Sequence, residues 1–507
     1  MYGSGLPRAF PSALQANLPR RSVAAVVLLV VLLCPAMAAG TQTDATGMAT
    51  TVAPVVERID NGQFAQAHAL IDSTLMQPGI PESQRTALEF ERERMRRILI
   101  DFSLDEEAAR QRVRRSIPDL RDAEFDDWTR SGLLESLRID GKRRYFNRSV
   151  SNLFLLSADA ASRRTPPVAP PQDGPHTRTH PHHRQVRQLA IASGQASAAP
   201  RRVRVTQTLT VEAGAVPAGE LVRAWVPYPR NLPGQQQDIR LLDSEPSKAL
   251  VASESAQQRT VYLEQPAVAG TPTRFSIQYE LTVLGRYHQI DPSRVLALGE
   301  RPDLAPYLVE RSPHIVYTDA LRRFSREAVG DERNPYRIAQ KLFAAVDRIP
   351  WAGAREYATL SNISDYALHA GHADCGQQTL LLMALLRLNG IPARWQSGMV
   401  YSDGDYDNLH DWGQLYLAPY GWVPMDVTTG RLDDTDPGIE WFYLGGLDAY
   451  RIAFNDDYAS DLFPAKHHFR SDTVDSQRGE VEWQGGNLYF DQWDYSFEAR
   501  VVSPTRD

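Results

Sequence analysis

The sequence predicts an α+β protein with an N-terminal helical region, a β-sandwich-like domain and a core that mixes helices and strands. Three observations predict this fold class. Apolar residues recur at helical spacing before residue 163, they alternate with polar residues between about 203 and 283, and a leucine-rich helix followed by two strands lies beyond residue 334. The chain of 507 residues is long enough for about three domains. Its content of 42% hydrophobic and 23% charged residues is ordinary for a soluble globular protein.

Shifts in composition divide the chain into six expected parts. These are a signal peptide at 1–38, a helical accessory domain at 41–163, a disordered Pro/His-rich linker at 164–200, a β-sandwich-like domain at 201–290, a core at 300–430 and a C-terminal extension packed on that core at 431–507.

The first 38 residues resemble an export signal. Arg20 and Arg21 precede an unbroken apolar run from Val23 to Leu33, and Ala36-Met37-Ala38 then supplies small residues in an A-x-A cleavage pattern. The run is short for a membrane-spanning helix. We therefore expect an exported protein, periplasmic or secreted, that contacts a membrane only if the segment is retained as an anchor. N-terminal sequencing of protein from the cell envelope distinguishes the two cases.

The cysteine count adds one constraint. The chain has two cysteines, Cys34 within the expected signal and Cys375. Cleavage leaves a single thiol, which cannot form an internal disulfide in an oxidising compartment. Cys375 is then either a buried inert residue or a residue that is used chemically.

The helical region and the linker carry no evident catalytic residues. Residues 41–163 show helical apolar spacing, as at Val55, Ile59 and Phe64, and we interpret them as an accessory domain. The linker combines two Pro-Pro pairs with an Ala/Ser-rich stretch and cannot bury a core. It also holds four histidines, which could capture a metal adventitiously, but a functional site needs fixed geometry and we predict none. These histidines are His176, His180, His182 and His183.

The β-sandwich-like domain is predicted from alternation. Val203 to Val211 and Phe275 to Val283 place apolar residues at every second position, and Leu221 to Pro227 forms a strand that ends at proline. Short strands separated by Gly, Pro and Asn are typical of a β-sandwich.

The core begins with a helix capped by Asn334-Pro335 and then contains the chemically informative segment. Cys375 to Leu388 is rich in leucine, lacks proline and stops at Asn389-Gly390, which predicts a buried helix with Cys375 at its N-terminus. The positive end of the helix dipole favours a thiolate there, so we expect a lowered thiol pKa. Gly376 leaves room for a substrate, and the first-turn amides could bind an oxyanion.

Two strands complete the candidate site. His410 lies near the start of one strand, and Asp426 lies on the next, which is reached by a tight turn at 419–421. Adjacent strands can place the imidazole beside the carboxylate, and a helix packed across them can bring Cys375 to the imidazole. In such a triad the thiolate attacks, the histidine transfers the proton and the carboxylate fixes the histidine tautomer. Asp411 competes with Asp426 for the last role, but neighbouring strand residues point to opposite faces, which disfavours it.

These segments resemble the transglutaminase-like superfamily, a rearranged relative of papain. Its pattern is a Cys that opens a leucine-rich helix ending in Gly-Ile-Pro-Ala-Arg, then His-x-Trp, then Gly-Trp-x-Pro-x-Asp. All three motifs occur here in order, from Cys375 to Arg394, at His410 to Trp412, and from Gly421 to Asp426. The resemblance covers about 334–430. It implies a papain-like transglutaminase core and assigns catalytic roles to Cys375, His410 and Asp426.

One position departs from the family pattern. An acidic residue commonly follows the Trp of His-x-Trp by two positions, whereas this chain has Gln414, which cannot carry charge. We expect Gln414, Gly376, Trp412 and Trp351 to lie at the substrate cleft, although core packing is an alternative for both tryptophans. His372 is either a pH-sensitive neighbour of the thiol or a surface loop histidine.

The expected function is therefore acyl transfer at an amide bond through a thioester on Cys375. Water as acceptor gives a protease or amidase, and an amine gives a protein-crosslinking transglutaminase. A non-catalytic binding or envelope assembly module is the alternative of another class. The expected partner is a protein or peptide substrate without a cofactor. The formal net charge of −7 provides no global basic field for nucleic acid.

Overall fold

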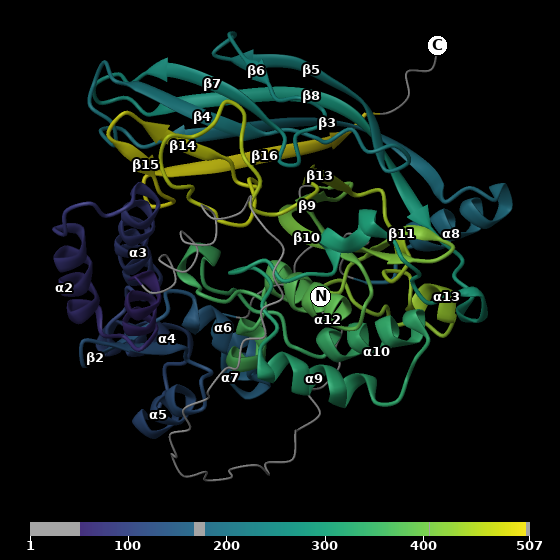
Figure 1. Ribbon diagram of the computed structural model, residues 1–507, viewed down its shortest axis with the longest axis horizontal. Coiled ribbons are helices and arrows are strands. Elements are labelled where there is room, and N and C mark those ends of the chain that lie inside the picture. Colours follow the sequence, from purple (N-terminus) through teal and green to yellow (C-terminus); the bar gives the residue numbers. More distant parts are fainter. Residues whose placement is uncertain (1–50, 167–177, 405, 503–507) are drawn as a thin grey trace, which may run out of the picture.

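The computed structural model describes residues 51–166, 178–404 and 406–502. The expected signal peptide at 1–38, Cys34 and His176 lie outside these residues. Among the described residues, no helix combines the length and the apolar character that a membrane span requires. The fold is the expected α+β arrangement of a helical region, a β-sandwich and a mixed core (Figure 1).

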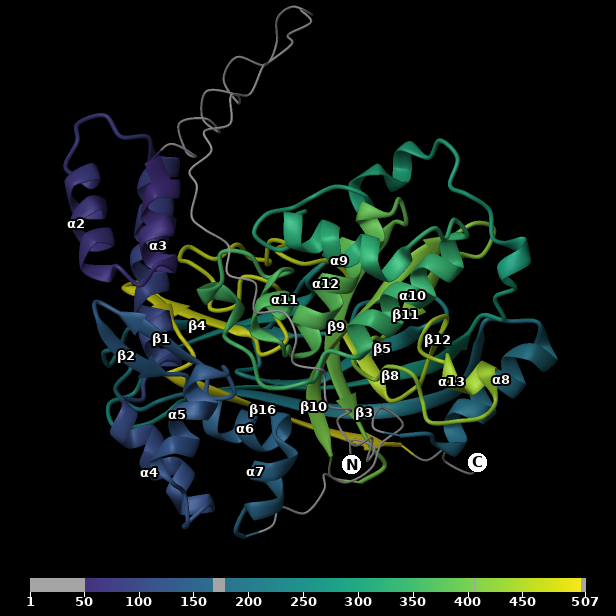
Figure 2. The same ribbon diagram turned by 90° about the horizontal axis from the view of Figure 1, so that it is seen from below.

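The N-terminal region packs around two small apolar clusters, one built on Phe64 and Met95 and the other on Phe125 and Leu153. It forms the purple and blue side of the molecule in Figures 1 and 2. A helix at 51–60 precedes its other elements. These are α2 (Phe64–Leu75), α3 (Glu82–Asp101), α4 (Glu106–Ser116), α5 (Asp122–Arg130), the hairpin β1 (Ser136–Ile139) and β2 (Lys142–Tyr145), α6 (Ser149–Leu156) and α7 (Ala158–Arg163).

A helix that the sequence did not suggest interrupts the expected linker. Helix α8 (Pro181–Ser193) begins at the His180 cap with proline in its first turn and ends at Gly194, whose φ of +67° is left-handed. The expectation of disorder over 164–200 is therefore wrong for this part. The reason is packing, because Val186, His182 and His183 are buried against the sandwich and the core.

Two five-stranded antiparallel sheets make the sandwich, and their inner faces share one apolar core. Long strands β3 (Ser197–Val211) and β8 (Thr273–Tyr287) pair along most of their length. The first sheet has the order β12-β8-β3-β16 with β5 also on β8, and the second has the order β15-β14-β4-β7-β6. The remaining bounds are β4 (Leu221–Pro227), β5 (Gln236–Glu245), β6 (Leu250–Val251), β7 (Thr260–Pro266), β12 (Gly446–Leu447), β14 (Glu480–Trp483), β15 (Gly486–Leu488) and β16 (Trp493–Val501).

The C-terminal residues take a different place from the expected one. The sequence predicts that the extension at 431–507 packs on the core; its strand at Arg451–Asn455 does join the core sheet, but β14, β15 and β16 join the two sheets of the sandwich. Strand β16 pairs with β3 from Trp493↔Val211 to Val501↔Val203. The sandwich is thus built from residues on both sides of the core in the sequence. Local alternation in β16 resembles that of any half-buried strand, so its partner could not be predicted.

The core places helix α12 (Cys375–Leu388) against an antiparallel sheet of order β11-β10-β9-β13. Almost all residues of α12 are buried, from Gly376 to Arg387, and α10 covers another side of the helix. Asn389 caps the end, and Gly390 follows with a left-handed φ of +74°. The other elements are η1 (Pro292–Arg294), η2 (Pro302–Tyr307), α9 (Asp319–Val329), α10 (Pro335–Asp347), η3 (Tyr357–Thr359), α11 (Tyr366–Ala370), β9 (Ala393–Tyr401), β10 (Asp407–Leu417), β11 (Gly421–Met425), α13 (Pro437–Glu440) and β13 (Arg451–Asn455).

Truncation after Asn455 tests the place of the C-terminal strands. The truncated chain keeps β13 but loses β14 to β16, which uncovers apolar faces of both sheets. We expect insoluble protein, or soluble protein without a cooperative thermal transition. A chain that ends after Val502 is the control and should melt like the full chain. A cooperative, wild-type-like transition of the shorter chain would show that the extension is dispensable for the sandwich.

Candidate active site

A cleft of about 400 Å³ contains the thiol of Cys375 and the imidazole of His410. Its volume lies in the range of ligand-binding pockets. Three parts of the chain line it: the core, the N-terminal helical region through Arg148, and the C-terminal segment through Asp472, Gln477, Arg478, Phe490, Trp493, Asp494 and Tyr495. The sequence pattern indicated the first of these parts alone.

The start of α12 positions the thiol. Asp374 is the N-cap, and its side chain accepts the amide of Gln377 at 3.0 Å, so Cys375 is the first helical residue. Gly376 is needed because a Cβ atom there would lie 2.0 Å from the hydroxyl oxygen of Tyr357 and 2.8 Å from Asp411. The predicted helix and its N-terminal cysteine are both present.

The thiol has an unexpected partner. Cys375 donates to Oδ2 of Asp411 at 3.1 Å, and among the described residues no hydrogen bond joins Cys375 to His410. The hydroxyl of Tyr357 donates to Asp374 at 3.0 Å and lies 3.4 Å from Asp411. Asp411 is next to His410 on β10, and both residues line the cleft.

The electrostatics of this pocket oppose a free thiolate. Burial raises the pKa of the Cys375 thiol well above its usual value, and Asp411 and Asp374 raise it further. Burial also raises the pKa of Asp411 well above its usual value, with Asp475 and Asp374 adding to the effect. The pKa of Asp374 is raised to about 6, chiefly by burial. The expected lowering of the thiol pKa is therefore wrong for this structure, because desolvation and two carboxyls outweigh the helix dipole.

His410 and Asp426 form the other half of the site. The Nε2 atom of His410 donates to Oδ2 of Asp426 at 2.8 Å, which leaves Nδ1 as the basic ring nitrogen. Asp426 is fully buried and also accepts from Arg451 at 2.7 Å and from the Thr429 hydroxyl at 2.7 Å. Although burial alone would raise it, the His410 and Arg451 partners bring the pKa of Asp426 far below its ordinary value. The carboxylate is thus ionised at any working pH.

The other predicted residues lie at different depths. Trp351 lines the cleft. Trp412 is fully buried, stacks on His410 with ring centroids 6.0 Å apart and donates its indole N–H to Gln396 at 2.9 Å. Gln414 is buried away from the cleft and accepts from Nε of Arg394 at 2.9 Å. Trp412 and Gln414 do not line the cleft, so the structure places them in support of the site and not at its surface. Gly376 does not line it either, because Tyr357 and Asp411 fill the space that was predicted to leave room for a substrate.

His372 is not the surface residue that one interpretation expected. It is buried, its Nδ1 atom lies 3.2 Å from the Ala370 carbonyl oxygen, and its Nε2 atom lies 4.0 Å from Glu135 of the helical region. Burial lowers its pKa. It contributes to the contact between core and helical region and does not line the cleft.

A loop from the sandwich reaches the back of the site. Gln477 donates to the His410 carbonyl oxygen at 2.8 Å and to Oδ1 of Asp411 at 2.6 Å. Next to it, Arg478 makes a bidentate pair with Glu356 at 3.1 and 2.8 Å. The position of β10 at the thiol is therefore tied to a segment more than sixty residues further along the chain.

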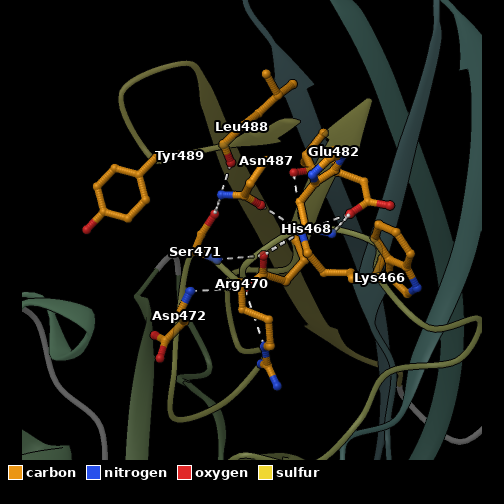
Figure 3. A network of polar contacts seen from close by, with 12 residues as sticks. Lys466, His468, Arg470, Ser471, Asp472, Glu482, Asn487, Leu488 and Tyr489 are labelled. Atoms are coloured by element: carbon orange, nitrogen blue, oxygen red, sulfur yellow. Dashed lines mark hydrogen bonds and ion pairs between the residues drawn. The ribbon is translucent and has the colours of Figure 1, made fainter. Parts of the chain in front are cut away.

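Figure 3 shows polar contacts that join the segment from Lys466 to Asp472, which precedes this loop, to residues of β14 and β15. Glu480 on β14 is fully buried and accepts the backbone amides of Ser471 and Asp472 at 2.8 and 2.9 Å. Lys466 lies 3.0 Å from the same carboxylate and donates to Asn487 at 2.7 Å. Buried charge is compensated within the loop and its strand, which fixes the path of the chain toward Gln477.

The helical region holds the opposite wall. Asn152 on α6 donates to the Gly353 carbonyl oxygen at 2.7 Å and accepts its amide at 3.0 Å. Asp101 on α3 accepts the amide of Glu356 at 3.0 Å. These contacts fix residues 353–357, which carry Tyr357 to the thiol. The region therefore shapes the cleft, a role that sequence analysis missed because these contacts join residues more than 200 positions apart.

Comparison with known proteins gives a family for the core. Residues 322–427 match the model of the transglutaminase-like superfamily, and this range includes Cys375, His410 and Asp426. These residues form a transglutaminase-like core. The match places the core broadly among cysteine-type enzymes, and the fold class and family resemblance inferred from sequence are confirmed. Among curated proteins, none matches the chain.

Three solved structures show weak likeness. A proposed cysteine protease from Cytophaga hutchinsonii is 14% identical, with a TM-score of 0.41, over 61% of this chain and 94% of its own. The periplasmic domain of TgpA from Pseudomonas aeruginosa, bound to ethylmercury, is 15% identical, with a TM-score of 0.24, over 48% and 94%. A proposed protease from Parabacteroides distasonis is 10% identical, with a TM-score of 0.19, over 51% and 68%. Scores below 0.5 are too low to support further comparison.

Replacement of Asp411 tests its effect on the thiol. We expect Asp411→Asn to lower the apparent pKa of Cys375, because the amide keeps the shape and cannot become a second negative charge. The rate of alkylation by iodoacetamide, followed by mass spectrometry across pH, should rise at lower pH than in the wild type. Asp407→Asn, on the same strand and also at a carboxyl with a raised pKa, is the matched control. An unchanged alkylation profile in Asp411→Asn would mean that Asp411 does not oppose the thiolate.

Proposed function

We propose that the protein is a cysteine-dependent acyl-transfer enzyme that acts on amide bonds, with Cys375 as nucleophile, His410 as general base and acid, and Asp426 as the residue that orients His410. The observation that carries this proposal is one cleft that exposes a helix N-terminal thiol together with an imidazole whose Nε2 is already held by a buried carboxylate. This arrangement is suited to nucleophilic catalysis.

In the proposed reaction the thiol first leaves Asp411 and transfers its proton to Nδ1 of His410. The sulfur then attacks the amide carbonyl carbon, and the C–N bond breaks as the imidazolium protonates the departing amine. A thioester on Cys375 remains. The amides of Gln377 and Gln378 already bond to Asp374, so the amides of Cys375 and Gly376 are the candidates to stabilise the oxyanion.

The acceptor decides the type of enzyme. Attack by water on the thioester, with His410 again as base, regenerates the thiol and gives a protease or amidase. Attack by an amine gives an isopeptide crosslink. We favour hydrolysis because water is always present at high concentration in a cleft open to solvent. We also propose that the protein acts outside the cytoplasm, because residues 1–38 have the sequence pattern of an export signal.

Product analysis tests the proposal. Peptide and envelope-protein libraries are incubated with the protein, and products are identified by mass spectrometry. New termini are expected, whereas isopeptide links would favour transfer. If neither product forms although the wild-type thiol can be alkylated under the same conditions, the result would favour a non-catalytic binding or assembly module.

Substitution of the three residues tests their roles. Cys375→Ala and His410→Ala should each abolish turnover, and Asp426→Asn should reduce it by a factor on the order of 10⁴ or less, because its role is orientation. His369→Ala, an exposed histidine paired with Asp365, is the control for histidine loss and should retain turnover. Thermal melting distinguishes loss of chemistry from loss of fold. Wild-type rates in Cys375→Ala would refute the mechanism.

Metal removal tests the alternative hydrolase chemistry. Among the described residues, no group of three or more His, Cys, Asp or Glu side chains could hold a metal ion. We expect full activity in EDTA and loss of activity after alkylation or on addition of zinc, which would bind the thiol. Activity that is lost in EDTA and restored by stoichiometric zinc would instead indicate a metal enzyme.

A further inference from the structure

A continuous chain of buried polar contacts runs from helix α8 to the candidate catalytic histidine. Its members are fully buried or nearly so, with exposed fractions between 0 and 1% before His410 and 8% at His410. In order from α8, the members are His183, Tyr443, Asp448, Arg451, Asp426 and His410. We call this set the polar chain. Helix α8 lies beside the end of β3 in Figures 1 and 2 and belongs to the segment expected to be a linker.

The tautomer of His183 follows from its own helix. Its Nδ1 atom accepts the backbone amide of His180 at 3.0 Å, so the ring proton must lie on Nε2. Burial lowers the pKa of His183 to about 3, and the ring is therefore neutral. Nε2 lies 2.9 Å from the Tyr443 hydroxyl and donates to it. This donation leaves the hydroxyl proton of Tyr443 free to point the other way.

In the remaining contacts the two carboxylates accept and their neighbours donate. Tyr443 donates to Oδ2 of Asp448 at 2.7 Å, and Arg451 bridges Asp448 and Asp426, donating to Asp426 at 2.7 Å. Asp448 also accepts the amide of Tyr450 at 2.9 Å through its other oxygen. The sequence of contacts ends with Asp426 accepting from Nε2 of His410.

We propose that the polar chain is a positioning device in which His183, through Tyr443, Asp448 and Arg451, holds Asp426 where it selects the His410 tautomer with a proton on Nε2. The proposal rests on the proposed function, since the selected tautomer leaves Nδ1 as the base for the thiol. It also gives a reason for the burial of His183, which neither a metal site nor a disordered linker would explain.

The geometry gives a reason for coupling over this distance. A guanidinium between two carboxylates can shift toward either one. The Tyr443 hydroxyl donates a hydrogen bond to Asp448, which weakens the attraction between Asp448 and Arg451 and leaves Arg451 in hydrogen-bonding distance of Asp426. Without that hydroxyl, Asp448 draws the guanidinium away, and Asp426 loses a partner that fixes its orientation toward His410. Networks of this kind act as units, so we expect the effects of substitutions at their members to be non-additive.

The test uses four variants of the full chain with kcat, KM and thermal midpoint measured for each. Tyr443→Phe removes the central hydroxyl and should lower kcat about tenfold, while KM stays within about twofold. His183→Phe keeps a ring against Phe442 but removes the donor, and should lower kcat by about three- to tenfold. His183→Gln retains a neutral N–H donor and should recover most of the rate. The double variant His183→Phe/Tyr443→Phe should lose no more than Tyr443→Phe alone.

A matched control lies on the same helix. His180→Asn removes an imidazole that lies outside the polar chain and keeps a residue suited to the helix cap. It should retain wild-type kcat. A loss in His180→Asn equal to that in His183→Phe would assign the effect to the stability of α8 and overturn the proposal.

A spectroscopic readout separates this proposal from the proposed function. Selective ¹⁵N labelling of histidine in the Cys375→Ala background reports the His410 tautomer without turnover, with the signal assigned by its absence in His410→Ala. We expect the Nε2-protonated form in that background and a mixture of tautomers when Tyr443→Phe is added. If the wild type shows no turnover, the proposed function fails while this measurement still decides the polar chain. If folded Tyr443→Phe has the wild-type rate and an unchanged His410 tautomer, the proposed role of the polar chain is overturned. This result decides the proposal even if His183→Phe does not fold.

Discussion

The structure around the candidate site depends on keeping the Asp426 carboxylate charged in a place without water. Burial of an ionised carboxylate is costly unless charge and hydrogen bonds compensate it. Here the compensation comes from Arg451, His410, the Thr429 hydroxyl and the amides of Thr428 and Thr429. Arg451 is itself buried and needs a second carboxylate, Asp448, which brings β13 and its preceding turn to the site. Removing one member of such a buried pair costs about 3–5 kcal/mol, so the site and the surrounding fold are stabilised together.

On the thiol side of the cleft, the buried carboxyl group of Asp411 has no cation among the described residues to compensate it. The side chain of Asp411 accepts hydrogen bonds from the Cys375 thiol, the Tyr357 hydroxyl and the Gln477 amide, all of them uncharged. Burial without a cation favours the neutral carboxylic acid. The pKa values of two aspartates on neighbouring elements are thus shifted in opposite directions, because within the described part of the chain one has a guanidinium partner and the other does not. The raised pKa of the thiol belongs to the same environment, and it explains why the helix N-terminus alone does not define the state of Cys375.

The sequence predicted those features that are encoded locally. The leucine run and the Asn389-Gly390 stop predicted α12 with Cys375 at its start. Alternation predicted β3 and β8, and a tight turn at 419–421 placed the strands of His410 and Asp426 next to each other. It did not predict helix α8, because a Pro/His-rich composition indicates a loop and the burial of His182 and His183 depends on tertiary partners. Three further features could not be predicted, because each depends on a pairing between distant segments. They are the place of β16, the contact of Asp411 with the thiol and the contacts of Gln477.

The origin of the cleft walls has a consequence for the order of events during synthesis. Chains emerge N-terminus first, and domains generally fold as they become available. Cys375 and His410 precede Gln477 and Arg478 in the chain, and the loop that carries the latter two is held by β14, which must pair with β4 from far upstream. A nascent chain can therefore contain both reacting groups without the wall that frames them. The cleft is complete only when the sandwich is complete, so the site forms after strands β14 to β16 have been synthesised and paired.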